Sequence, residues 1–144
     1  MKKLIFLSLI ILISLSCSQK GPNFPQGAWK QYSSEHYVDG KLAKKDIVKY
    51  DNRKMFSEKN WAFVWKIQTD TMTYYNYGAG TYTLKGKDYA ETIDFHVAKE
   101  YEGQTLKMSL ELVNDTLVQA WNPMDSTGKP STKIRYVDKY SHLK

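Results

Sequence analysis

The chain has 144 residues, among which 21 lysines and arginines outnumber 15 aspartates and glutamates, so its formal net charge is +6. This balance is only mildly basic and lacks the dense Lys/Arg footprint of a nucleic-acid-binding protein, so we expect no nucleic-acid partner. A single cysteine, Cys17, leaves no disulfide within the chain, so the packing of apolar side chains must stabilise the fold.

The first 16 residues have the layout of a secretory signal peptide. Lys2 and Lys3 precede an apolar run from Leu4 to Leu15. That run is shorter than the roughly 20 apolar residues that span a bilayer. Cleavage before Cys17 would leave the length of one domain.

The four residues Ser14-Leu15-Ser16-Cys17 resemble the lipobox of bacterial lipoproteins, in which the cysteine after the cleavage site is lipidated. The resemblance implies a membrane anchor at Cys17, made of acyl chains such as palmitate. It also implies a place in the cell envelope. Lys20 and the absence of Asp directly after Cys17 favour the outer membrane, facing the periplasm or the exterior, by analogy with the sorting rules of some bacteria. The alternative is an ordinary signal peptide followed by an incidental cysteine.

Residues 17–26 predict a lipidated cysteine and a flexible tether, because SQKGPNFPQ contains prolines, a glycine and little apolar surface. Residues 27–144 predict one β domain, because apolar residues recur there at every second position and Tyr, Trp, Thr, Val and Ile are abundant. Turn signals such as Asp39-Gly40 separate the runs. The expected strands are 27–37, 42–50, 53–57, 61–68, 71–77, 80–85, 89–99, 104–113, 116–121 and 132–140.

Alternation also predicts which side chains share a face. The expected apolar faces are Trp61, Phe63, Trp65 and Ile67 in one strand, and Ile93, Phe95 and Val97 in another. His96 would then lie on the polar face of its strand, with Asp94. Short strands joined by tight turns predict an all-β fold, an antiparallel up-and-down β-barrel, because closure removes exposed sheet edges. We expect no helix of any length.

The domain opens with Gly27-Ala28-Trp29, and this Gly-x-Trp before an all-β meander resembles the start of lipocalins and of the wider calycin superfamily. The stretch YGAGTYTLKGKDYAETIDF is similar to the middle of small lipocalin-like domains of exported bacterial proteins. The resemblance implies a lipocalin-like barrel in which Trp29 packs across the closed end under an arginine of the last strand. Arg135 is the candidate for that arginine, since a guanidinium stacks well on an indole.

Four Trp, eleven Tyr and five Phe exceed what a plain core of this size needs. A tyrosine offers an apolar ring with a polar tip, so Tyr75, Tyr77 and Tyr82, with His96 nearby, are the candidate ligand-binding residues. The alternative is cross-strand pairing on the sheet surface. Residues 41–59 hold seven Lys/Arg and three acids, which predicts a solvated hairpin or, alternatively, a patch that attracts anionic headgroups or ligands.

The spacing of histidines and of the lone cysteine predicts no metal site, and we expect no cofactor. No nucleophile accompanies Asp94 and His96, so we expect no enzymatic activity. The expected function is binding of a small, partly apolar ligand in the barrel. The alternative is a non-enzymatic structural or interaction subunit, with an envelope protein as partner and a barrel filled by its own aromatic side chains.

Overall fold

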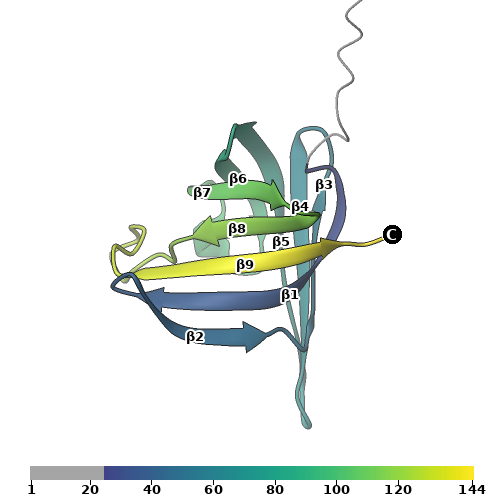
Figure 1. The fold of residues 1–144 in the computed structure, drawn as a ribbon, viewed down its shortest axis with the longest axis vertical. Coiled ribbons are helices and arrows are strands. Elements are labelled where there is room, and N and C mark those ends of the chain that lie inside the picture. Colours follow the sequence, from purple (N-terminus) through teal and green to yellow (C-terminus); the bar gives the residue numbers. More distant parts are fainter. Residues whose placement is uncertain (1–24) are drawn as a thin grey trace, which may run out of the picture.

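The computed structural model describes residues 25–144, so the predicted signal peptide 1–16, Cys17 and most of the predicted tether 17–26 lie outside the described residues (Figure 1). The described chain forms nine strands and one 3-10 turn, η1 (Lys99–Tyr101), which confirms the all-β prediction. The strands are β1 (Gly27–Val38), β2 (Lys41–Ile47), β3 (Asp51–Phe56), β4 (Asn60–Gln68), β5 (Thr73–Lys85), β6 (Asp88–His96), β7 (Thr105–Val113), β8 (Thr116–Trp121) and β9 (Ile134–His142). In this described part, no helix is long and apolar enough to cross a membrane.

Eight strands, β1 and β3 to β9, close into an antiparallel up-and-down barrel, as the sequence predicted (Figure 1). From β3 to β9, each strand pairs with the next one in the chain. Closure depends on β1, which pairs with β9 from Trp29 to Val38 and with β3 over Gly27–Lys30. The two chain-distant strands β1 and β9 therefore lie side by side.

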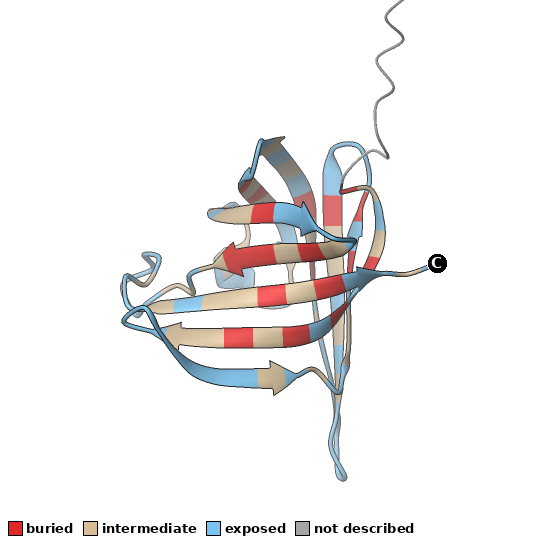
Figure 2. Cartoon of the chain, viewed as in Figure 1, coloured by how far each residue is buried: buried red, intermediate tan, exposed pale blue. Residues whose placement is uncertain are grey.

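β2 is a ninth strand outside this ring. It pairs with Ser33–Val38, the part of β1 that β3 does not cover. Its other edge pairs with no strand of residues 25–144. Three of its seven residues are lysines, and almost the whole strand is exposed (Figure 2). Lysines on an open edge discourage pairing with another chain, so this edge is protected against aggregation.

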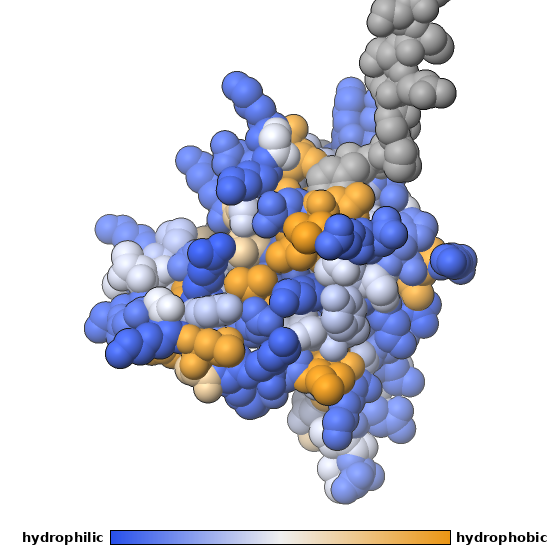
Figure 3. All heavy atoms as spheres, in the orientation of Figure 1, coloured by the Kyte–Doolittle hydropathy of each residue, from blue (hydrophilic) through white to orange (hydrophobic). Residues whose placement is uncertain are grey.

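The hydrophobic core gathers around the start of β1. Its buried members are Trp29, Phe56, Trp61, Tyr89, Ile93, Leu110, Leu117 and Tyr140. The indole Nε1 of Trp29 donates to the carbonyl of Pro25 at 2.7 Å, and Pro25 is itself buried. On the outer face seen in Figure 3, hydrophobic residues form separate patches among hydrophilic ones, so the continuous apolar packing lies inside the barrel.

A bulge in β6 changes which side chains of this strand point inward. Gly80 of β5 pairs with Ile93, whereas the residue before Gly80 pairs with Phe95, so Asp94 is the extra residue. The extra residue shifts the alternation. Ile93 is 2% exposed and Phe95 is 68% exposed, so the predicted common face of these residues is wrong. His96 lies inside with Ile93, and the exposed Asp94 does not share its face.

Candidate functional site

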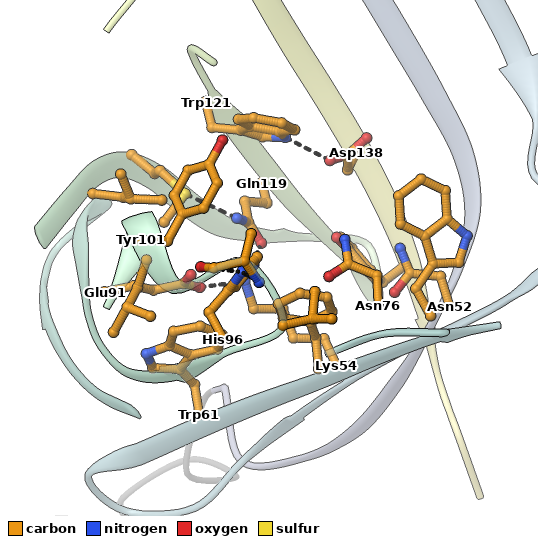
Figure 4. A pocket seen from close by; sticks show the side chains of 18 residues that line it. Asn52, Lys54, Trp61, Asn76, Glu91, His96, Tyr101, Gln119, Trp121 and Asp138 are labelled. Carbon is orange, nitrogen blue, oxygen red and sulfur yellow. Dashed lines mark hydrogen bonds and ion pairs between the residues drawn. The ribbon is translucent and has the colours of Figure 1, made fainter. Parts of the chain in front are cut away.

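A cavity of about 360 Å³ lies inside the barrel, between β3 to β9 and the segment that follows β6 (Figure 4). Its volume falls in the lower part of the roughly 300–1,000 Å³ that small-molecule sites occupy. The wall is mostly aromatic and aliphatic. Its polar and charged side chains include Asn52, Lys54, Asn76, Glu91, His96, Gln119 and Asp138.

β4 supplies an aromatic wall. Trp61, Phe63 and Trp65 all line the cavity, so their predicted common face is confirmed, whereas Ile67, predicted to share it, is not part of the lining. The rings of Trp61 and Phe63 are parallel, with centroids 6.1 Å apart. Trp121 of β8 lies on the opposite side in Figure 4. The aromatic side chains therefore surround the space without filling it.

An ion pair is built into the cavity wall. Lys54 Nζ bonds to the carboxylate of Glu91 and, at 2.8 Å, to the side-chain oxygen of Gln119. Lys54 is 5% exposed and Glu91 4%. The ammonium also lies 5.3 Å from the ring centroid of Trp61, and the hydroxyl of Tyr89 donates to Glu91. Together the two charges are neutral, which is how a protein interior tolerates them.

Asp138 is a further buried carboxylate on the wall, and its hydrogen-bond partners are neutral. Gln31 Nε2 and Ser34 Oγ donate to Oδ1 at 2.7 and 2.6 Å. Trp121 Nε1 donates to Oδ2 at 2.7 Å. Asn52 in turn donates to Gln31, so a chain of hydrogen bonds runs toward the carboxylate. Burial raises the pKa of Asp138, and the hydrogen bonds it accepts oppose that rise.

Two polar atoms of the wall lack a hydrogen-bond partner among residues 25–144. They are Trp65 Nε1, a donor, and Asn76 Oδ1, an acceptor. Trp65 and Asn76 face each other across the β4–β5 pairing. A buried polar atom without a partner costs about 1–3 kcal/mol. Both atoms have almost no surface open to the cavity, so a guest could pair with them only after a side chain of the wall moves.

Of the four predicted ligand-binding residues, His96 alone lines the cavity. Its ring lies 5.8 Å from that of Phe63 and 4.8 Å from that of Tyr101, between centroids. Its Nδ1 accepts the backbone N–H of Ala98 at 3.0 Å. His96 is therefore held in place by the segment that follows β6.

The three tyrosines lie elsewhere. Tyr75 and Tyr77 are 57% and 51% exposed, because their neighbour Asn76 takes the inward position of β5, so their expected place in the pocket is wrong. Tyr82 is not part of the cavity lining either. Its ring packs against Phe56 at 5.6 Å between centroids, and its hydroxyl donates to the carbonyl of Ser57 at 2.9 Å.

The expected stack of Arg135 on Trp29 is not formed. Trp29 pairs with His142, whereas Arg135 pairs with Tyr37, seven residues away along β9. At about 3.4 Å per residue, this separation is roughly 24 Å. His142 takes the expected place, since its ring meets Trp29 edge-on with centroids 4.9 Å apart. A Cβ on Gly27 would lie 2.5 Å from His142 Nε2, so this contact requires the predicted glycine.

The buried polar residues were missed by sequence reasoning. Lys54 was assigned to the solvated segment 41–59, which is wrong for this residue. A signal was present, because Lys54 is two residues from Phe56, and Glu91 is two residues from both Tyr89 and Ile93. Residues two apart in a strand share a face, so these charges were in phase with core residues.

The arrangement suits non-covalent binding. Lys54 and Glu91 neutralise each other, and Asp138 is held by three donors. Among the described residues, no group of three or more His, Cys, Asp and Glu side chains is placed to hold a metal ion. The polar groups can orient a guest, and the aromatic wall can provide contact area.

No protein-family model matches the chain, and no curated protein is significantly similar to it in sequence. The function must therefore be argued from the cavity and from the sequence.

Proposed function

We propose that this protein is a lipocalin-like binding protein of the cell envelope, which holds one small, partly apolar molecule in its barrel without chemical change. The cavity of about 360 Å³ carries the proposal, because it combines an aromatic wall with the two unpaired atoms of Trp65 and Asn76. Protein interiors are close-packed, and an open space forfeits dispersion contacts. A guest would restore those contacts against the aromatic wall.

The test is the binding of an apolar fluorescent dye to the purified protein. We expect saturable binding with a stoichiometry near one. Trp65→Ala should weaken the affinity for the dye about tenfold, because it removes an aromatic wall of the cavity. Tyr77→Ala is the matched control, since it truncates an aromatic side chain on the outer face of β5. It should leave the affinity unchanged.

The same variants separate binding from a structural role. Denaturation midpoints are measured alongside the dye affinity. Weak, non-saturable dye binding, together with a large loss of stability in Trp65→Ala, would contradict the proposal. That result would favour the alternative, a structural subunit whose interior packs only for stability.

The lipid anchor belongs to the same proposal and rests on the sequence of residues 1–17. Two acyl chains on Cys17 would hold the protein at a membrane. Cys17→Ala should therefore move it out of the membrane fraction, while Ser18→Ala should not. A wild-type protein without acyl mass, or unchanged membrane fractionation of Cys17→Ala, would exclude the anchor.

A further inference from the structure

The charged side chains on the cavity wall do not balance. Lys54 and Glu91 neutralise each other through a direct contact. Asp138 accepts hydrogen bonds only from neutral groups. The ring of His96 bonds to the backbone of Ala98 and forms no hydrogen bond with Asp138. With both carboxylates ionised, the wall therefore carries one negative charge that no cation of residues 25–144 contacts directly.

We propose that the ligand is a small organic molecule with a protonated amine, and that Asp138 is its counter-ion. This inference rests on the proposed function and names the chemical class of the guest. A carboxylate offers about four acceptor positions. Three of those on Asp138 receive donors, from Gln31, Ser34 and Trp121. The remaining position, on a residue that lines the cavity, suits an ammonium N–H.

The aromatic wall favours a cation as well. An ammonium within about 6 Å of a ring centroid is attracted by the negative face of the ring, most strongly by tryptophan. Trp61, Trp65 and Trp121 all line the cavity. The interior already holds one ammonium in this way, because Lys54 Nζ lies 5.3–5.7 Å from three ring centroids.

Asp138 is held in place by hydrogen bonds that reach across the barrel wall. Asn52 of β3 donates to Gln31 of β1, and Gln31 donates to Asp138 of β9. Asn52 itself pairs with Trp65 across β3 and β4. The carboxylate is therefore fixed by three strands before a guest binds.

An anionic guest fits the same wall poorly. Among the described residues Lys54 is the only lysine or arginine of the wall, and two of its three N–H donors bond to Glu91 and Gln119. A carboxylate would therefore meet the charge of Asp138, while the one ammonium nearby is already neutralised by Glu91. Like charges in a low-dielectric interior repel strongly.

The experiment compares, by isothermal titration at neutral pH, three compounds that share a phenyl ring on a two-carbon chain and differ in the polar group at its end. They are 2-phenylethylamine, 2-phenylethanol and 3-phenylpropanoate. We expect the amine to bind at least about tenfold tighter than the alcohol, and the acid to bind most weakly. Asp138→Asn should lower the affinity for the amine to that for the alcohol. Tyr77→Ala, on the outer face, should leave the order of the three affinities unchanged.

The wild-type series decides the inference even if Asp138→Asn does not fold. Equal or tighter binding of the alcohol or the acid would overturn the amine assignment and leave the binding function intact. The same holds if the apolar dye binds with saturation and the amine does not. If neither the dye nor any of the three compounds binds, the proposed function itself fails.

Discussion

The pair of Lys54 and Glu91 offers a sharp test of how the barrel interior is built. Glu91→Gln keeps the size of the side chain but removes its negative charge. Lys54 is 5% exposed and contacts no other carboxylate among the described residues. Leaving one buried charge without its partner costs about 3–5 kcal/mol. Because domains of this size are stable by about 5–15 kcal/mol, the urea midpoint should fall steeply.

A second variant separates the charge from the shape. Lys54→Met combined with Glu91→Gln removes both charges at similar length, so it should recover most of the stability that Glu91→Gln loses. The matched control is Asp46→Asn. Its pair with Lys44 is 3.0 Å long, but these side chains are 45% and 66% exposed, so no measurable change is expected. Urea unfolding followed by tryptophan fluorescence gives each value, provided that the slope stays constant.

Two results would refute this reasoning. If Glu91→Gln is as stable as Asp46→Asn, the pair is not buried as described. If the double variant is as unstable as the sum of its two single variants, the charges do not depend on each other.

Three further predictions concern other parts of the fold. Burial raises the pKa of Asp138 above its ordinary 3.8. The contribution of Asp138 to the free energy of unfolding should therefore be lost as pH rises from 3.8 through the folded pKa. Urea unfolding of Asp138→Asn should no longer show this loss of stability with pH. Trp29→Ala should cost about 3–5 kcal/mol and Arg135→Ala far less. The two effects should add within about 0.5 kcal/mol, because the residues lie at opposite ends of the β1–β9 pairing. Gly80→Ala should destabilise the fold strongly in the same assay, since the new Cβ would overlap with the backbone oxygen of Thr92, far inside van der Waals contact.

The barrel could be predicted because its strands follow a simple alternation. In β4, Trp61, Phe63 and Trp65 occupy every second position, and all three point inward. Turn residues with positive φ, such as Asp39 and Gly40, mark where the chain reverses. Alternation and turns together suffice for an antiparallel meander, because each strand needs only its neighbour in the chain.

The details of β5 and β6 could not be predicted in this way. A bulge at Asp94 inserts one residue into β6 opposite Gly80 of β5. A glycine inside a strand signals a bulge, but it does not tell which residue of the partner strand is the extra one. The tyrosines of β5 were assigned inward for their chemistry, but the inward position belongs to Asn76. The family resemblance predicts Arg135 beside Trp29, but the register of β1 and β9 pairs Trp29 with His142.

The buried charges show which sequence pattern indicates the polar residues of the cavity wall. A charged residue in phase with core aromatics is either an error of strand assignment or a group that the interior must compensate. Lys54 is in phase with Phe56, Glu91 with Tyr89, and Asp138 with Tyr140. Three in-phase charges inside one barrel can form one ion pair, which leaves a single carboxylate over. Because that carboxylate lines the cavity, the imbalance belongs to the proposed binding site, and it is the basis for proposing a cationic guest.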